Sequence, residues 1–325
     1  MRRFMKSGLP ACQPSLLSNL ALRRCFATSA QQSPGKKLES ILIANRGEIA
    51  LRVARTAAQH GIGVSTLYTT PDEHSQHAFA SHNAFNLGDD TAGYLDGKRI
   101  IEIAKREGCD AVHPGYGFLS ENADFARMCT EAGLIFIGPS SKAIEEMGDK
   151  SRSKEIMNSA GVQCVPGYHG TNQDASFLAS RASEIGYPIL IKAVKGGGGK
   201  GMRIAFSESE FESQLISAKS EARGAFGPEN DAVLIERYIT QPRHVEVQVF
   251  ADLHGNVVAL GERDCSVQRR HQKILEESPA PNLSPELRKD LWQKARAAAR
   301  AVNYCGAGTV EFILDNETGS SFLWK

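Results

Sequence analysis

Short apolar runs alternate with helical patterns in the first part of the chain. Residues 41–44 are uninterrupted apolar positions, which predicts a buried strand. Residues 48–59 then space apolar side chains at helical intervals, and residues 64–68 form the next strand-like run. The alternation continues with helices at 98–107 and 122–132 and strands at 110–113 and 134–137. Strands separated by helices predict a parallel, doubly wound sheet, so we expect a Rossmann-like α/β domain at residues 38–148.

The pattern changes after residue 150, where extended runs follow one another closely. Predicted helices lie at 151–160, 175–185, 208–222 and 287–302, and predicted strands at 189–193, 202–205, 232–238, 244–251, 257–262 and 309–314. In the run 244–251, valines alternate with polar residues, so one face is buried and His244, Glu246 and Gln248 share the other. We therefore predict that residues 149–325 form an α+β domain with an antiparallel platform.

Composition and charge exclude two classes of protein. The 325 residues are 41% hydrophobic and 23% charged, with a formal net charge of +1. These values are typical of a globular protein, whereas a general nucleic-acid binder usually carries a larger basic excess. No apolar run reaches the roughly 18 residues that a transmembrane helix needs.

The N-terminal segment differs in composition from the rest. Its first acidic residue is Glu39, and the preceding residues are rich in arginine, serine and alanine. An acid-free, arginine-rich and serine-rich start is typical of an organellar transit peptide. A disordered tail without a targeting role is the alternative. In either case we exclude residues 1–37 from the fold.

A run of glycines and lysines follows the predicted strand at 189–193 and reads Lys195-Gly196-Gly197-Gly198-Gly199-Lys200-Gly201. Glycines let the backbone approach a ligand closely, and their N–H groups can point at phosphate oxygens. The Walker pattern fails at Met202, and the dinucleotide fingerprint needs a helix where a strand is predicted. A flexible linker and a flap over a nucleoside triphosphate remain. The strands predicted on both sides favour the flap, and no kinase HRD or DFG motif is present.

Charged residues near this loop are candidate ligands. Lys192 ends the preceding strand and Lys150 opens a helix; each alone is commonly a surface lysine, but beside the loop both become candidate phosphate ligands. Residues 268–273 form a dense donor set that fits phosphate or bicarbonate, although a solvated charge run or a nucleic-acid patch has the same composition. Glu311 and Ile313 share one strand face, so Glu311 can hold Mg²⁺ while Ile313 packs on adenine.

Several long motifs occur in order, and at these the chain resembles the biotin carboxylase component of biotin-dependent carboxylases. They are residues 43–50 (Ile-Ala-Asn-Arg-Gly-Glu-Ile-Ala), 113–122 (His-Pro-Gly-Tyr-Gly-Phe-Leu-Ser-Glu-Asn), the glycine loop, 242–246 (Pro-Arg-His-Val-Glu), 262–266 (Glu-Arg-Asp-Cys-Ser) and 268–273 (Gln-Arg-Arg-His-Gln-Lys). The resemblance covers about residues 39–322. The segment 167–170 (Gly-Tyr-His-Gly) looks most like the α subunits of mitochondrial methylcrotonoyl-CoA carboxylases, and propionyl-CoA carboxylase α subunits are the next candidates.

The resemblance implies an ATP-dependent ligase of the mitochondrial matrix, with residues 1–37 as its transit peptide. Residues 149–325 would be an ATP-grasp domain with a glycine-loop lid at about 165–239. ATP would phosphorylate bicarbonate, the carboxyphosphate would release CO₂, and biotin on a carrier domain would take it up. The implied cofactors are ATP and Mg²⁺ or Mn²⁺. The implied partners are the biotinylated carrier and a carboxyltransferase β subunit, in a complex of leucine catabolism.

The resemblance also implies roles for single residues. Expected around the nucleotide are Lys150 and Lys192 (phosphates), Gly196, Gly197, Gly198, Gly199, Gly201 and Met202 (cover), Glu236, Arg237 and Ile239 (adenine), and His244 and Gln268 (ribose). Arg270, His271 and Lys273 are expected to act in catalysis, with His271 at the phosphates and Lys273 at bicarbonate. Glu311 is the expected metal ligand.

The chain departs from the family pattern at its C-terminal end. The family continues after the strand of Glu311 with Met-Glu-Met-Asn-Thr-Arg and then a Gln-Val-Glu segment, whereas this sequence reads Ser321-Phe322-Leu323-Trp324-Lys325. We therefore expect the ATP-grasp domain to be incomplete, without a second metal carboxylate, the bicarbonate arginine, the base glutamate and the carrier domain. The expectation is little turnover and poor solubility for the isolated chain.

The departure leaves two hypotheses for the function. One is a biotin carboxylase, and the other is a nucleotide-binding remnant without turnover. A different ATP-grasp ligase, such as a carbamoyl-phosphate synthetase, is disfavoured by the motifs at 113–122 and 268–273. The acyl-CoA specificity does not follow from these residues.

Overall fold

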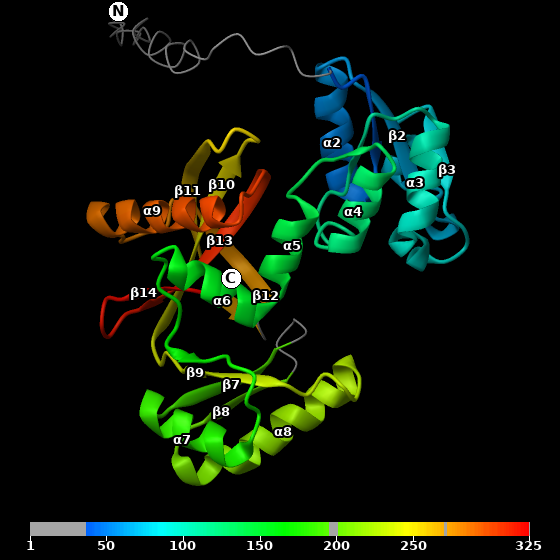
Figure 1. Ribbon diagram of the computed structural model, residues 1–325. Helices are drawn as coiled ribbons and strands as arrows, with labels where there is room; N and C mark the ends of the chain where they lie inside the picture. Colours follow the sequence, from blue (N-terminus) through cyan, green and yellow to red (C-terminus); the bar gives the residue numbers. More distant parts are fainter. Residues whose placement is uncertain (1–36, 195–200, 270–271, 325) are drawn as a thin grey trace, which may run out of the picture. The chain divides into compact units, whose positions relative to one another are not determined.

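The computed structural model describes residues 37–194, 201–269 and 272–324. The chain from Glu39 onward is one compact unit. Within it, the described strands form a five-stranded parallel sheet, a four-stranded small antiparallel sheet and a five-stranded large antiparallel sheet (Figure 1). The predicted strands and helices are found in these layers, and the mixed α/β class is confirmed.

The parallel sheet has the order β3-β2-β1-β4-β5. Its strands are β1 (Ser40–Ile43), β2 (Gly63–Tyr68), β3 (Asn83–Asn86), β4 (Ala111–His113) and β5 (Ile135–Phe136), connected through α2 (Gly47–Gln59), α3 (Gly97–Arg106), α4 (Ala123–Glu131) and the short helices η1 (Thr70–Asp72), η2 (Gln76–Phe79) and η3 (Thr91–Leu95). Leu42 packs into the core with α3 and α4. Its neighbours Ile41 and Ile43 point the other way and are also buried, so both faces of the sheet are covered, as the alternation predicted.

The small antiparallel sheet has the order β6-β9-β7-β8. Its strands are β6 (Gly167–Tyr168), β7 (Ile189–Ala193), β8 (Met202–Ala205) and β9 (Val233–Arg237). Helices α7 (Ala175–Ile185) and α8 (Glu208–Phe226) pack on one face, where the core includes Leu178, Phe211 and Ile191. The residues of the other face, Leu190, Lys192, Leu234 and Glu236, are buried as well.

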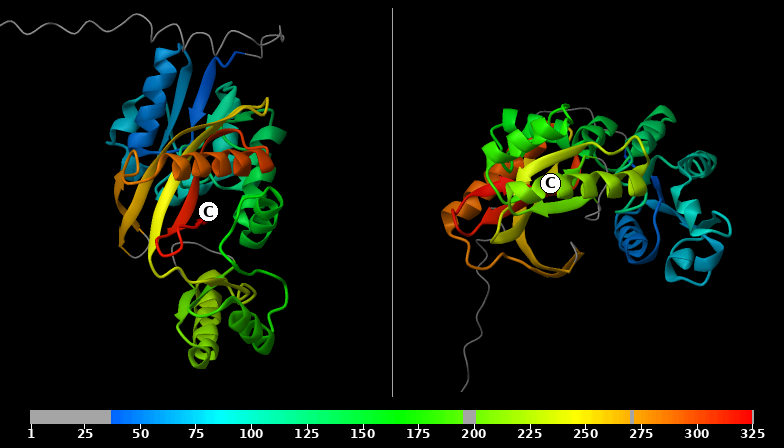
Figure 2. Two further views of the ribbon diagram at one scale, coloured as in Figure 1. Left: turned by 90° about the vertical axis from the view of Figure 1, so that its left-hand side faces the viewer. Right: turned by 90° about the horizontal axis from the view of Figure 1, so that it is seen from below.

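The large antiparallel sheet has the order β12-β11-β10-β13-β14. Its strands are β10 (Pro242–Ala251), β11 (Val257–Arg269), β12 (Gln272–Glu277), β13 (Gly306–Asp315) and β14 (Ser321–Leu323). Helix α9 (Pro285–Ala301) lies across one face (Figure 2) and packs on the alternating valines of β10, together with α5 (Ser141–Gly148) and α6 (Lys150–Ser159). The opposite face carries His244, Glu246 and Gln248, as the period-two pattern predicted.

Side-chain hydrogen bonds fix the first residues of two helices, α9 and α6. Ser284 accepts a hydrogen bond from the Leu287 N–H with Pro285 in the first turn, so α9 begins two residues before the predicted residue 287. The Asp149 carboxylate accepts from the N–H groups of Ser151 and Arg152. This cap fixes α6 so that Lys150 is its first residue.

The platform differs from the prediction, because it is two antiparallel sheets and because β11 continues to Arg269 instead of ending at residue 262. The pattern stopped at a charged stretch. Inside the fold each of these charges has a partner: Glu262 pairs with Arg288, Arg263 with Glu246, and Asp264 with Arg243. Bulges on both sides of β11 also break the alternation on which the prediction relied.

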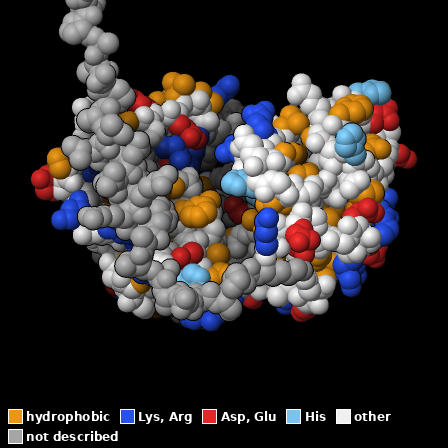
Figure 3. Space-filling model, turned by 90° about the horizontal axis from the view of Figure 1, so that it is seen from above, with side chains coloured by type: hydrophobic (Ala, Val, Ile, Leu, Met, Phe, Trp, Pro, Cys, Tyr) orange, Lys and Arg blue, Asp and Glu red, His pale blue; other side chains and the backbone are white. Residues whose placement is uncertain are grey.

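The described surface agrees with the nearly balanced charge. On the face shown in Figure 3, basic and acidic side chains are interspersed among the described residues. Among the helices that the structure describes, we find none with both the length and the apolar character to cross a bilayer.

The core of the large sheet gives a stability prediction. Phe312 on β13 is fully buried beneath α9, whereas Phe250 on β10 is 52% exposed on the other face. Phe312→Ala should lower the free energy of unfolding by about 3–5 kcal/mol, because it leaves a cavity, and Phe250→Ala by less than about 1 kcal/mol. Denaturant unfolding monitored by circular dichroism measures both. Equal losses in the two variants would contradict this packing.

Candidate functional site

A buried carboxylate shared by two lysines lies on the small antiparallel sheet. Glu236 on β9 is fully buried, and its Oε2 is 2.5 Å from the Nζ of Lys192 on β7. Its Oε1 pairs with Lys154 on α6. In the β7–β9 register Glu236 lies opposite Leu190, two positions before Lys192, so the two charged side chains are diagonal neighbours on one face.

The electrostatics of this trio leave an excess of positive charge. Burial lowers the pKa of Lys192, and although Glu236 opposes this, the pKa falls to about 8. Burial acts to raise the pKa of Glu236, but the two lysines outweigh it and hold that pKa below its ordinary value. Two cations around one carboxylate in a poorly solvated place favour the binding of a further anion.

The described ends of the glycine loop are tied to the same place. Lys150 donates from Nζ to the carbonyl oxygens of Ala193 and Val194, at 3.2 and 3.0 Å. At the other end Gly201 has φ +72°, and a Cβ there would lie 2.9 Å from that of Ala193, so the turn needs glycine. Gly196, Gly197, Gly198 and Gly199 lie outside the described residues.

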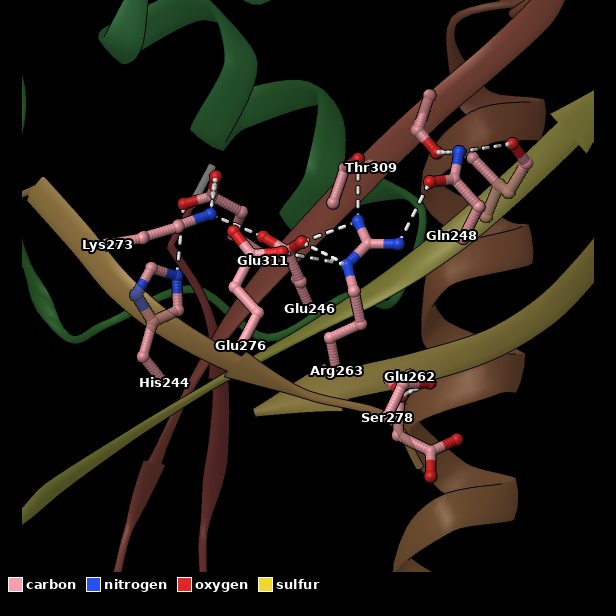
Figure 4. Close-up of polar contacts among 12 residues, drawn as sticks. His244, Glu246, Gln248, Glu262, Arg263, Lys273, Glu276, Ser278, Thr309 and Glu311 are labelled. Atoms are coloured by element: carbon pink, nitrogen blue, oxygen red, sulfur yellow. Dashed lines mark hydrogen bonds and ion pairs between the residues drawn. The ribbon is translucent and has the colours of Figure 1, made fainter. Parts of the chain in front are cut away.

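A second charged cluster lies on the polar face of the large sheet (Figure 4). Glu246 on β10 and Glu311 on β13 are directly opposite each other. Lys273 on β12 reaches between them, pairing with Glu246 and donating to Glu311 Oε1 at 3.0 Å. Arg263 on β11 holds the other side of Glu246 through its Nε, 2.6 Å from Oε1. Opposed carboxylates would repel, and these cations remove the repulsion.

The cluster fixes the charge states of its members. Burial acts to raise the pKa of Glu311, but hydrogen bonds from His244 and Lys273 prevail and lower that pKa to about 2. Burial acts to lower the pKa of Lys273, but the two glutamates prevail and raise it. At neutral pH, Glu311 is therefore a carboxylate and Lys273 an ammonium.

His244 is held in one orientation by two partners. The Gln268 Nε2 donates to its Nδ1, and the same amide nitrogen donates to the Cys265 carbonyl at 2.7 Å. With Nδ1 accepting, the proton is assigned to Nε2, which lies 3.0 Å from Glu311 Oε2. The structure thus brings together His244, Gln268, Lys273 and Glu311, whereas Arg270 and His271 lie outside the described residues.

An apolar cluster joins the two antiparallel sheets. Val165, Ile239, Ile313 and Phe322 pack together, with Trp324 against them. Ile313 is on the same face of β13 as Glu311, as predicted from alternation. The two other predicted residues of this region are less enclosed: Met202 begins β8 half-buried, and Arg237 ends β9 exposed.

Glu311 fits a role as one metal ligand but not as a complete site. It is an ionised hard oxygen donor of the kind Mg²⁺ prefers, and each oxygen has a lone pair beyond its hydrogen bond. Among the described residues, the one group of three side chains close enough to share an ion is Glu246, Cys265 and Glu276. That group suits Mg²⁺ poorly, because burial raises the pKa of the Cys265 thiol to about 12 and Glu246 is already held by two cations.

The sequence reasoning missed three residues of these clusters. Lys154 follows Lys150 by one helical turn, and that spacing placed both on one face of α6. Glu246 and Arg263 lie in motifs that were noted, but their mutual pairing depends on the register of β10 with β11. The alternation along β10 did signal that Glu246 belongs to the polar face.

Comparison with known proteins agrees with this geometry. Residues 149–323 match the carbamoyl-phosphate synthase L chain ATP-binding domain, and residues 37–144 match the biotin carboxylase N-terminal domain. The chain is 56% identical over 290 residues to the mitochondrial methylcrotonoyl-CoA carboxylase subunit alpha of Dictyostelium discoideum, which covers 89% of this chain and 41% of that protein. The chain thus spans less than half the length of this curated relative.

Solved structures show the same fold. A biotin carboxylase complex with β,γ-ATP from Campylobacter jejuni aligns with a TM-score of 0.84 and 44% identity, over 88% of this chain and 64% of that one. The biotin carboxylase domain of Hydrogenobacter thermophilus 2-oxoglutarate carboxylase, solved with MgADP and bicarbonate, aligns with a TM-score of 0.83 and 44% identity, over 89% and 63%. On its two domains and these likenesses, the chain belongs to the biotin carboxylase family.

Proposed function

We propose that this chain is the nucleotide-binding part of a biotin carboxylase in a methylcrotonoyl-CoA carboxylase-like complex. In the proposed reaction, the terminal phosphoryl group of ATP passes to bicarbonate, ADP leaves, and biotin on a carrier domain receives the released CO₂. The observation that carries the proposal is the net positive trio of Lys154, Lys192 and Glu236 beside the glycine loop. The relatives named for this activity support it.

The trio suits a polyphosphate. Lys192 and Lys150 both supply charge at the start of the loop, while Glu236 keeps Lys192 in place. Phosphoryl transfer depends on neutralising and positioning charge rather than on covalent help from the protein. By the family resemblance, Gly196, Gly197, Gly198, Gly199, Gly201 and Met202 would cover the nucleotide; of these the structure describes Gly201 and Met202.

The apolar cluster suits a nucleobase. Ile239 and Ile313 offer apolar surface to adenine, and Glu236 and Arg237, which end the adjacent strand β9, would line the same pocket. His244 and Gln268 are fixed as a pair and would face the ribose.

The second cluster suits the acceptor and the metal. Lys273, an ammonium between two carboxylates, would hold bicarbonate. Arg270 would act with it in catalysis and His271 would meet the phosphates; both lie outside the described residues. Glu311 would supply one oxygen to Mg²⁺ or Mn²⁺, which when bound withdraws charge from the phosphate oxygens.

A nucleotide-binding role without turnover is the second candidate. It is favoured by the contact of Trp324 with Lys192. It is also favoured because, among the described residues, the carboxylate directly opposite Glu311 is Glu246, which two cations already hold. Release of ADP from Mg-ATP that requires both bicarbonate and biotin would establish the enzyme. Binding of ATP without such release would establish the second candidate.

The proposed partners are the biotinylated carrier and a carboxyltransferase β subunit, with leucine catabolism as the setting. A propionyl-CoA carboxylase-type α subunit is the alternative. Support comes from the names of the relatives. Co-purification of the tagged chain with its native β subunit, followed by assay of both acyl-CoA substrates, distinguishes the two.

Lys192 gives the first prediction. Lys192→Met should weaken binding of Mg-ATP by about 10- to 100-fold, because a charge-assisted hydrogen bond to phosphate is lost. Calorimetric titration measures the affinity. Lys142→Met, at a lysine whose side chain is 79% exposed, is the matched control and should change nothing.

The same titration has a pH signature. Since the pKa of Lys192 is lowered to about 8, the free chain loses this cation as pH rises through 8, and ATP binding should weaken from pH 7 to 9. Lys192→Arg, which stays charged, should lose this pH dependence. A wild-type affinity that is constant over this range, or unchanged by Lys192→Met, would contradict the assignment.

Glu311 gives the second prediction. Glu311→Gln should raise the Mg²⁺ concentration that is needed to promote ADP binding by at least about 10-fold. In the wild type, the effect of Mg²⁺ should persist from pH 5 to 8, because the Glu311 carboxylate has a pKa of about 2. Titrating Mg²⁺ at fixed ADP measures it. Glu276→Gln tests the neighbouring group; if it abolishes the Mg²⁺ effect and Glu311→Gln does not, the metal assignment is wrong.

The N-terminal segment gives the third prediction. We propose that residues 1–37 direct the chain to the mitochondrial matrix, since Glu39 is the first acidic residue. A fluorescent reporter fused behind residues 1–38 should enter mitochondria. The same fusion with Arg2, Arg3, Arg23 and Arg24 changed to glutamate should remain in the cytosol, and equal distribution of both fusions would refute the proposal.

A further inference from the structure

Trp324 connects the two clusters of the candidate site. Its backbone N–H donates to the Glu311 carbonyl at 2.8 Å. The preceding Leu323 bridges to Cys164, and its N–H donates to the Gln163 carbonyl at 2.8 Å. The backbone that carries the Trp324 ring is thus held on both sides.

The ring lies over the lysine of the buried trio. The Nζ of Lys192 is 3.4 Å from the centroid of the Trp324 ring, well inside the roughly 6 Å limit for a cation–π contact. On another side the same ammonium pairs with Glu236 at 2.5 Å. The remaining ring surface packs on the apolar cluster with Ile239 and Ile313.

A phosphate oxygen that bound Lys192 on the side of the Trp324 ring would have to take the position that the ring occupies. Charge-assisted N–H···O bonds to an ammonium have lengths of about 2.7–2.9 Å, so an oxygen on this side of Lys192 would overlap the indole. We infer that Trp324 masks Lys192 and competes with the nucleotide phosphates, so that ATP binding requires the ring to leave. This inference rests on the proposed nucleotide function of the same site.

Two variants separate masking from packing. Trp324→Leu keeps apolar contact with the cluster but removes the π face, and Trp324→Phe keeps a weaker π face. Because a cation–π contact to a partly desolvated ammonium is strong, Trp324→Leu should bind Mg-ATP about 3- to 30-fold more tightly than the wild type. The Mg-ATP affinity of Trp324→Phe should lie between those of the wild type and Trp324→Leu. Phe206→Leu, at a ring that is 63% exposed and follows β8, is the control and should leave the affinity unchanged.

Fluorescence provides a second readout, because the sequence has two tryptophans. Trp292 on α9 donates a hydrogen bond from Nε1 to Glu262 of the large sheet. The variant Trp292→Phe therefore leaves Trp324 as the one fluorescent tryptophan. Adding ATP to this variant should shift the emission to longer wavelengths as the ring enters water. An emission that does not change while ATP binds would overturn the inference.

The affinities decide the remaining cases. If Trp324→Leu binds ATP no more tightly than the wild type while Lys192→Met still weakens binding, the masking inference is wrong but the proposed nucleotide site is supported. If neither wild type nor Trp324→Leu binds ATP at millimolar concentration, both the inference and the proposed function are wrong. Tighter binding by Trp324→Leu with an unchanged Phe206→Leu supports the inference.

Discussion

The burial of Glu236 between two lysines is the constraint on which the candidate site depends. An ionised carboxylate without solvent is costly, and pairing with Lys154 and Lys192 offsets that cost. Lys154 comes from α6 and Lys192 from β7, so the trio ties a helix that packs on the large sheet to the small sheet. One carboxylate cannot neutralise two ammonium groups, and the excess positive charge lies beside the glycine loop.

In the large sheet, two carboxylates lie close together and need cations between them. Glu246 and Glu311 face each other across β10 and β13, and Lys273 and Arg263 offset their repulsion. A strand with one apolar and one charged face can do this only because α9 covers the apolar face. Glu311 and Ile313 share one face of β13, and Trp324, which packs on the apolar cluster of Ile313, contacts Lys192 of the trio. Charged and apolar groups thus adjoin one another, which suits a ligand with a flat base and a charged tail.

The predicted strands and helices are found in the predicted order, because periodicity follows burial; along β10, for example, valines alternate with polar residues from His244 to Val249. The sequence also singled out Lys192, Lys273 and Glu311. It did not reveal Lys154, because in the sequence this residue looks like an ordinary lysine on a helix surface. It is buried only because the fold brings it against Glu236. The extension of β11 beyond residue 262 was missed for the same reason, because Arg263 and Asp264 looked solvent-exposed until Glu246 and Arg243 were placed beside them.

The most direct test of the account is a crystal structure of the chain with MgADP or a non-hydrolysable ATP analogue. We expect phosphate oxygens within hydrogen-bond distance of Lys192 Nζ, the metal at Glu311, and the Trp324 ring turned away from the lysine. Phosphates bound elsewhere, with the Trp324 ring still over Lys192, would contradict it.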